Sequence, residues 1–164
     1  MTHTFDRRQL LTLAAAAVVP LQPARHDGEA ASIRALMVRL RAMYEARDVT
    51  GLPTVVAPGV VFADPTFHFE ATGLEALQKM FAVHAQAILD LRVAVEREVI
   101  LPPWAIVQQT QTFTVKTPAG PRTAAVRGVS LYRVERGLVA EWWDYYDAAG
   151  YQRQVQATGP GAAR

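Results

Sequence analysis

Cysteine is absent from the 164-residue chain. The protein can therefore form no disulfide bond, has no thiol nucleophile and offers no cysteine ligand to a metal ion. Apolar residues make up 51% of the sequence, which is enough to bury a substantial core without disulfide support. A chain of this length and composition is expected to fold as one domain rather than to remain disordered.

A large excess of charge of one sign is also missing. The chain has 17 basic and 15 acidic side chains, a formal net charge of +2, and no basic run interleaved with aromatic residues. Nucleic acid is therefore not an expected partner, because it requires a concentrated positive surface. The HExxH, GxGxxG and P-loop motifs of metal, dinucleotide and phosphate sites are missing as well. We expect neither a cofactor nor a metal.

No hydrophobic run is long enough to span a bilayer comfortably, and the most apolar stretch lies near the N-terminus. Residues 1–24 combine Arg7-Arg8 with a short alanine-rich segment and a polar break that begins at Gln22. This anatomy is typical of an export signal, and the arginine pair followed by Gln9-Leu10-Leu11 resembles the twin-arginine type. Asp6 departs from the usual Ser or Thr, and an ordinary amphipathic N-terminal helix is the alternative interpretation.

Export predicts a periplasmic or extracellular protein with no stable membrane anchor after processing. Cleavage after Ala24 and cleavage near Ala30 both fit the polar break. The expected organisation is a single domain over residues 25–156, followed by a mobile tail at 157–164 that is rich in Gly and Ala.

Apolar periodicity predicts the order of elements in the rest of the chain. Spacing by threes and fours indicates a helix with Ser32 as its N-cap, a short one that includes Leu52 and Val56, and a longer one after Gly73. Two short strands are expected before that last helix, and alternation from Leu91 onward predicts four long strands. This order predicts an α+β fold, in which a cone-shaped, strongly curved, mainly antiparallel sheet wraps over about three helices and leaves an apolar pocket.

The last predicted strand carries the first candidate for acid–base chemistry. Alternation places Asp144 on one face of this strand between Trp142 and Tyr146. A carboxylate in such apolar surroundings is either paired or has a raised pKa, which makes Asp144 a candidate catalytic residue. The alternative is an ion pair with Arg127 or Arg133 on the neighbouring strand.

His84, on the predicted longer helix, is interpreted as a core residue rather than as a catalytic residue or a metal ligand. His84 lies on the apolar stripe of the helix that follows Gly73, and nothing nearby completes a metal-ligand spacing. We therefore expect a core histidine with one satisfied ring nitrogen.

Five segments, taken in this order, resemble the nuclear-transport-factor-2-like superfamily and especially its SnoaL-like branch. They are residues 44–48 (YEARD), 61–66 (VFADPT), 73–76 (GLEA), 132–142 (YRVERGLVAEW) and 144–147 (DYYD). The resemblance covers about Ile33 to Gln154. It implies the fold but no single reaction, because this fold hosts isomerases, cyclases, epoxide hydrolases, dehydratases and proteins without catalysis.

Resemblance to ketosteroid isomerase implies two site residues. In that enzyme an Asp before a Pro is the general base and a Tyr on the first helix donates a hydrogen bond to the oxyanion. Asp64 and Tyr44 match those positions, whereas Ser130 stands near the place of the second donor, a protonated Asp. The alternative role of Asp64 is to cap the Pro65-Thr66 turn through backbone hydrogen bonds.

Two other relatives imply Asp144. Limonene epoxide hydrolase is similar in its last strand, but the Arg and second Asp of its mechanism are replaced here within Gln109-Thr110-Gln111. The SnoaL-type polyketide cyclase also places an acid–base Asp on the last strand and needs only that carboxylate in an apolar cavity. The cyclase scheme is therefore the least contradicted by this sequence.

The function expected from these observations is cofactor-independent acid–base catalysis on an apolar small molecule, of isomerase, cyclase or hydrolase type. The alternative is a non-catalytic ligand-binding or interaction domain. The candidate catalytic residues are Asp144, Asp64 and Tyr44, and the candidate substrate-binding residues are Gln109, Gln111, His68, Trp142 and Ser130.

The resemblance also implies a homodimer, because members of this fold often associate through the outer face of the sheet. Val139, Trp143 and Tyr145 alternate with Trp142 and Asp144 and suit such a buried interface.

Overall fold

A computed structural model describes residues 23–156. The elements, in chain order, are α1 (Pro23–Ala46), the 3-10 helix η2 (Leu52–Thr54), β1 (Val56–Asp64), β2 (Phe69–Thr72), α2 (Leu74–Ala87), β3 (Ile88–Leu101), β4 (Trp104–Val115), β5 (Arg122–Glu135), β6 (Leu138–Tyr146) and α3 (Ala148–Gln156). The predicted signal and tail lie outside this range, apart from Pro23 and Ala24, which begin α1. Within residues 23–156 no helix is both long and apolar enough to cross a membrane.

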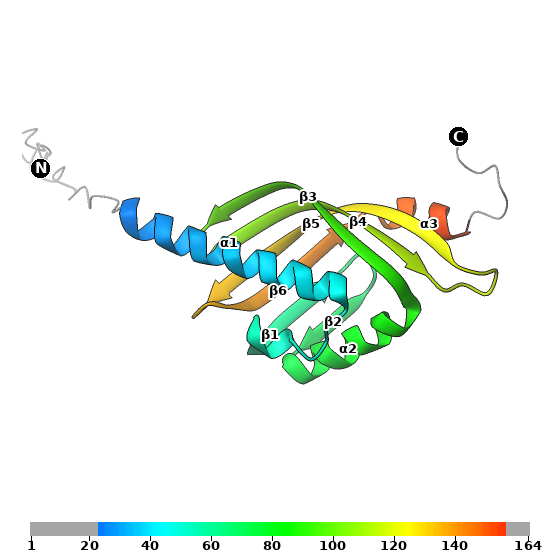
Figure 1. The fold of residues 1–164 in the computed structure, drawn as a ribbon, viewed down its shortest axis with the longest axis horizontal. Coiled ribbons are helices and arrows are strands. Elements are labelled where there is room, and N and C mark those ends of the chain that lie inside the picture. The colour runs from blue at the N-terminus through cyan, green and yellow to red at the C-terminus, as the bar shows by residue number, and fades with distance from the viewer. Residues whose placement is uncertain (1–22, 157–164) are drawn as a thin grey trace, which may run out of the picture.

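The strands form one six-stranded sheet in the order β2-β1-β6-β5-β4-β3. The strands of the meander β3 to β6 pair antiparallel with one another, as do β1 and β2, whereas β1 joins β6 in parallel. Figure 1 shows this sheet curving around the helices. The predicted α+β class and its mainly antiparallel sheet are confirmed.

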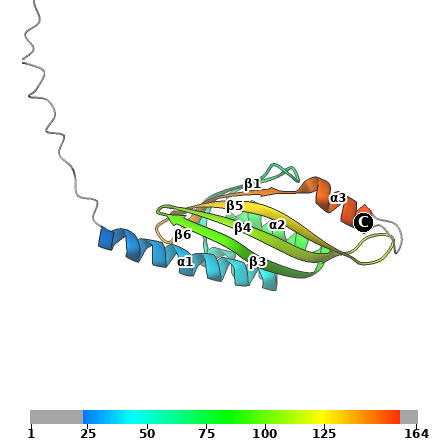
Figure 2. The same cartoon turned by 90° about the horizontal axis from the view of Figure 1, so that it is seen from above.

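The helices lie at different places around the curved sheet. α1 contacts β3, α2 contacts β1, β2 and β3, and α3 contacts β5. Figure 2 shows α1 running along the β3 side of the sheet, with α3 at the far end of β5.

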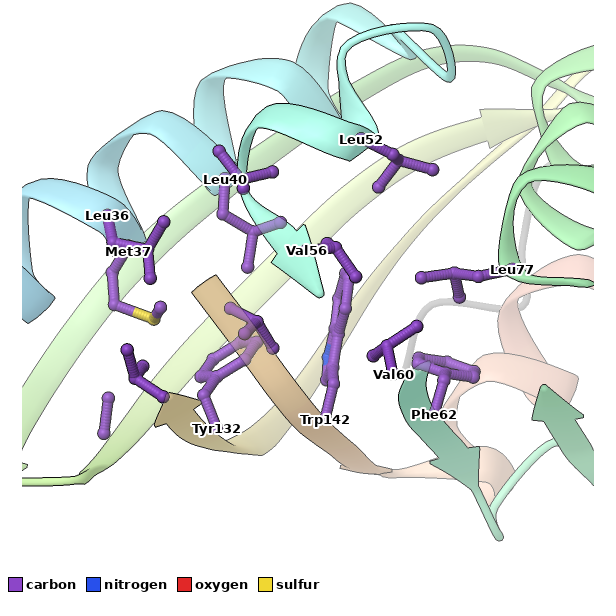
Figure 3. Close-up of a cluster of buried hydrophobic side chains, with 14 of the residues drawn as sticks. Leu36, Met37, Leu40, Leu52, Val56, Val60, Phe62, Leu77, Tyr132 and Trp142 are labelled. Carbon is purple, nitrogen blue, oxygen red and sulfur yellow. The ribbon is translucent and has the colours of Figure 1, made fainter. Parts of the chain in front are cut away.

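The core fills the part of the curved sheet that α1 crosses. Leu36, Met37 and Leu40, three or four residues apart on one face of α1, are buried as their spacing predicts. Their side chains point from α1 toward Tyr132 and Trp142 on the inner face of the sheet (Figure 3). Side chains occupy this region, and a larger open volume lies further along the sheet, between β1, α2 and α3.

Two predictions about helices in the N-terminal half of the chain are wrong: the N-cap at Ser32 and the short helix that includes Leu52 and Val56. α1 begins before Ser32, whose hydroxyl donates to the Gly28 carbonyl at 2.9 Å within the helix instead of capping it. The expected short helix is a single 3-10 turn at Leu52–Thr54, and Val56 already belongs to β1. Val56 pairs with Val139 of β6, so tertiary pairing of a β-branched residue ends the helical turn.

The third α-helix is α3, which the periodicity did not predict. Asp147 begins it as an N-cap: its Oδ1 accepts the backbone N–H of Gly150 at 2.8 Å. This aspartate, followed by Tyr151 and Val155 at a spacing of four, is the signal that could have revealed the helix.

A bulge in β6 changes which residues face outward. Arg133 pairs with Glu141 and Val134 pairs with Val139, so Ala140 is an extra residue between the two pairs. Val139 consequently points into the core and is 0% exposed, and its predicted place on the outer face is wrong. Tyr145 is exposed.

Candidate functional site

A cavity of about 300 Å³ lies between the sheet and the three helices. Aromatic rings from eight different segments dominate its wall, and they belong to Tyr44, Phe62, Phe67, Phe69, Phe81, Phe113, Tyr146 and Tyr151. The polar side chains in the same wall include Asp64, Asp144, Gln111 and His84. The candidate catalytic residues Asp144, Asp64 and Tyr44 are therefore brought together around one space.

Asp144 is held by one of its two oxygens. Ser130, its direct partner across the β5–β6 ladder, donates its hydroxyl to Oδ1, and the Trp142 indole N–H donates to the same Oδ1 at 2.8 Å. Oδ2 receives neither bond. The Tyr146 hydroxyl also hydrogen-bonds the Asp144 carboxyl and lowers its pKa, and Asp144 lines the cavity.

Burial determines the protonation of Asp144. The carboxyl is only 4% exposed, and this desolvation raises its pKa from 3.8 to about 7. The hydrogen bonds from Ser130 and Trp142 act in the opposite direction, and the nearby charge of Asp64 raises the pKa further. Asp144 therefore exists in both protonation states near neutral pH.

The ion-pair alternative for Asp144 is wrong. Arg127 pairs with Glu96 at 3.0 Å, and Arg133 binds Glu141 and Glu135. Both arginines belong to carboxylates other than Asp144, so its raised pKa is not offset by a cation.

A hydrogen-bonded network of amides and phenols supports the cavity wall. Tyr44 donates its hydroxyl to Gln111 Oε1 at 3.5 Å, and the amide nitrogens of Gln111 and Gln109 both donate to the Tyr146 hydroxyl, the latter at 3.1 Å. Gln109 also donates to Ser130 Oγ at 2.9 Å, which links the network to Asp144. Since the Tyr146 oxygen accepts two bonds, its own proton is free to be donated.

Asp64 occupies the end of β1 and has two roles in the structure. Its Oδ1 accepts the backbone N–H groups of Thr66 at 3.0 Å and Phe67 at 3.1 Å, which confirms the predicted turn cap. The residue is nevertheless 5% exposed and lines the cavity, and burial raises its pKa. Neither bond reaches Oδ2.

The predicted substrate contacts divide into two groups. Gln111 lines the cavity, whereas Gln109, Ser130 and Trp142 are buried behind its wall and orient the residues in front. His68 is not in the wall. It is exposed in the turn between β1 and β2, with a left-handed φ of 58° that helps this turn reverse the chain.

His84 is a wall residue that the sequence did not reveal. The half-buried imidazole packs edge-on against Phe69, with ring centroids 4.5 Å apart, and burial lowers its pKa. No hydrogen-bonding partner of its ring nitrogens exists among residues 23–156, so the expected satisfied core histidine is wrong. Its place three residues after Phe81 could have indicated a shared cavity face.

A curved six-stranded sheet with three helices around such a cavity defines the nuclear-transport-factor-2-like fold class. The family model for SnoaL-like polyketide cyclases matches residues 34–155, and the chain belongs to that family.

Solved structures share this fold at low sequence identity. A candidate SnoaL-like polyketide cyclase from Shewanella putrefaciens is 17% identical with a TM-score of 0.70, over 75% of this chain and 95% of that one. A protein of ketosteroid isomerase-like fold from Catenulispora acidiphila, in complex with trimethylamine, is 18% identical with a TM-score of 0.66, over 73% and 90% of the two chains. An LEH-like epoxide hydrolase from M. tuberculosis is 13% identical with a TM-score of 0.63, over 79% and 90%. No curated protein sequence matches the chain.

Proposed function

We propose that the protein is a cofactor-independent acid–base enzyme that acts on a small, largely apolar molecule. The observation that carries this proposal is Asp144, whose pKa of about 7 and lack of an arginine partner coincide in an aromatic-lined cavity. A group that titrates near neutral pH can both accept and return a proton, which typically accelerates reactions by about 10²–10⁴-fold.

The chemistry that this geometry supports is proton transfer next to a carbonyl group. Asp144 removes a proton from the carbon beside the carbonyl, and the electrons move onto the carbonyl oxygen. The Tyr146 hydroxyl stabilises this developing charge, because the two amide donors from Gln109 and Gln111 strengthen its own donation. Protonated Asp144 then returns the proton to a different carbon, which gives an isomer. Alternatively the enolate carbon forms a bond to a second carbonyl carbon of the substrate, whose C=O π electrons move onto its oxygen, and that oxygen takes the proton from Asp144, which gives a ring-closed alcohol.

Epoxide hydrolysis receives less support from the site. In the limonene epoxide hydrolase scheme an Arg and a second Asp act with the last-strand carboxylate, and Gln109 and Gln111 stand on the corresponding strand. Their amides are engaged with Ser130 and Tyr146, so they bring no charge to activate water.

Deuterium exchange into α-tetralone, an apolar ketone with acidic C–H bonds, tests the proposal without knowledge of the natural substrate. Mass spectrometry in D₂O should show exchange catalysed by the wild type and reduced by about 10²-fold or more in Asp144→Asn. Asp90→Asn, at an exposed position of β3, is the matched control and should exchange normally. Equal exchange by Asp144→Asn and the wild type would exclude Asp144 as the proton-transfer group.

The second candidate function is a non-catalytic ligand-binding domain. The turn-capping role of Asp64 favours it, because a purely structural carboxylate accounts for that residue. Trimethylamine bound to a relative of the same fold is consistent with either function. This alternative predicts that α-tetralone binds to the wild type and Asp144→Asn alike, with no exchange above the buffer rate.

We also propose that the protein forms a homodimer through the outer face of the sheet. Tyr145 is exposed and shares a face of β6 with Trp143, which stacks on Trp104 with ring centroids 6.1 Å apart, and this aromatic group supports the proposal.

Export through the twin-arginine route remains part of the proposed function and rests on Arg7-Arg8 and the segment behind it. Replacement of this pair by Lys-Lys should abolish secretion of the full chain, measured by fractionation. Unchanged secretion would refute the twin-arginine assignment.

A further inference from the structure

Two buried carboxylates lie side by side in the cavity wall. β1 and β6 run parallel with Phe62 opposite Trp142 and Ala63 opposite Trp143, so continuation of this register brings Asp64 beside Asp144. Each residue is at most 5% exposed, and the charge of Asp64 acts on Asp144. Like charges this close repel one another unless a proton or a cation lies between them.

Asp64 presents an unpartnered oxygen to the cavity, and Asp144 lines the same space. The Asp64 bonds to Thr66 and Phe67 end on Oδ1, and the Asp144 bonds to Ser130 and Trp142 likewise end on Oδ1. In the described part of the chain no buried polar side-chain atom lacks a partner, so Asp64 Oδ2 is reachable from the open space. The Asp144 carboxyl also takes a hydrogen bond from the Tyr146 hydroxyl, which belongs to the same cavity wall.

Positive charge near the two carboxylates comes from histidine: His84 lies in the cavity wall, and the charge of His68 lowers the pKa of Asp64. Neither lysine nor arginine occurs among the described residues that line the cavity. Arg47 lies in the wall of a smaller neighbouring cavity, where it donates to the Ile88 carbonyl at 2.6 Å. A ligand that enters the cavity therefore meets two carboxylates and no lysine or arginine.

The aromatic wall complements the carboxylates. The ring centroid of Phe67 lies 6.3 Å from that of Tyr146 and 5.2 Å from that of Tyr151. Phe62 precedes Asp64 by two residues on the same face of β1 and also lines the cavity. Aromatic faces attract cations, particularly weakly hydrated quaternary and tertiary ammonium groups. A hard metal ion requires six or more oxygen ligands, which two carboxylates among phenyl rings do not supply.

We infer that the ligand of this cavity carries an organic cation, an amine or quaternary ammonium group, which sits between Asp64 and Asp144 against the aromatic wall. The inference shares one assumption with the proposed function, which is that this cavity binds the substrate. It narrows the substrate from an apolar molecule to an apolar molecule with a positively charged nitrogen.

Three ligands of nearly identical shape test the inference. Phenyltrimethylammonium, tert-butylbenzene and benzenesulfonate each join a phenyl ring to a tetrahedral head group, and they are respectively cationic, neutral and anionic. Calorimetry or thermal shift at pH 8 should show the cation binding about tenfold or more tighter than the neutral compound, as one charge-assisted contact provides. The anion should bind weakest.

Variants assign the effect to the two carboxylates. Asp64→Asn keeps an Oδ1 that accepts the N–H groups of Thr66 and Phe67, so the turn should fold as in the wild type. We expect this variant to bind the cationic compound about tenfold more weakly and the other two compounds unchanged. Asp144→Asn should behave in the same way, whereas Asp90→Asn should bind all three compounds like the wild type.

The affinity for the cation should also rise between pH 5 and pH 8, because binding releases protons from the carboxylates. The titratable groups that face the cavity are Asp64, Asp144, Tyr44, Tyr146, Tyr151 and His84. Burial raises the pKa of Tyr44 and Tyr146, so these two remain neutral in this range. Burial lowers the pKa of His84, and the loss of its positive charge as the pH rises acts in the same direction as the carboxylates.

Each outcome separates this inference from the proposed function. Equal affinity for the cationic and neutral compounds overturns the inference while the ketone exchange assay still tests catalysis. Binding of none of the three, together with Asp144-dependent exchange of α-tetralone, also overturns the inference alone. Loss of exchange with retained selective binding of the cation overturns the proposed catalysis and leaves the cation site in place.

Discussion

Gly128 lies directly opposite Tyr146 in the β5–β6 ladder, and the Tyr146 ring covers the place of a side chain on Gly128. A Cβ built there would be 2.1 Å from Cδ1 of the ring. The missing side chain lets the ring lie flat across β5, so that its hydroxyl reaches Gln109 and Gln111 on β4. One glycine thus positions the phenol that we propose as an oxyanion donor.

We predict that Gly128→Ala will destabilise the protein by about 1–3 kcal/mol, because the added methyl group overpacks a buried ring. Gly59→Ala in β1 is the control, since nothing lies within 4 Å of its built Cβ, and it should change stability little. Urea unfolding measures both. Equal stability of the two variants would contradict the tight contact.

Asp144→Asn should stabilise the protein at neutral and alkaline pH. Burial raises the pKa of folded Asp144 from 3.8 to about 7, so the folded state binds the proton more tightly than the unfolded state. The contribution of this bound proton to the free energy of unfolding is fully present below pH 4, and it is lost as the pH rises through 7. Asparagine stays neutral, and its advantage should therefore grow over this range to at most about 4 kcal/mol. Unfolding curves at pH 4 and pH 8 check this, with Asp90→Asn expected to show no such trend.

Ser130→Ala should raise the pKa of Asp144 further. The Ser130 hydroxyl donates to Asp144 Oδ1 and lowers its pKa, and only the Trp142 indole would remain as a donor to that atom. Titration of a ¹³C-labelled carboxyl signal by NMR measures the midpoint directly. An unchanged midpoint would show that the hydrogen bond is absent in solution. Ser32→Ala, on the exposed side of α1, should leave the midpoint as in the wild type.

Tyr145→Arg should convert the proposed homodimer to a monomer. The ring is 48% exposed on the outer sheet face, where a charge would oppose burial against a second copy. Val38→Arg is a control of equal exposure at 49% on α1, away from that face, and should remain dimeric. Light scattering after size exclusion gives the masses, and a monomeric wild type would refute the interface.

The helix α1 and the long strands are visible in the sequence because their apolar periods are local properties. Leu36, Met37 and Leu40 are buried as their spacing indicates, and Trp142 and Asp144 share the inner face as alternation indicates. The cap of α3 at Asp147 is equally local, and it could have been predicted from the residues around it.

The positions of other residues depend on contacts between distant segments. Val139 turns inward because of a bulge that only the pairing of β5 with β6 creates. His84 faces open volume rather than core because the curved sheet is filled by α1 at one end and not at the other.

The sequence by itself determined the α+β fold and the interest of Asp144, which follow from residue order and alternation. It also indicated the family and Asp64, which follow from the resemblance of short segments to known proteins. Only the tertiary structure decided the chemistry of those carboxylates. It paired Arg127 and Arg133 with other acids, brought Asp64 beside Asp144, and enclosed both in aromatic rings. Desolvation and charge coupling depend on everything that surrounds a group, so they arise only when segments distant in the sequence meet.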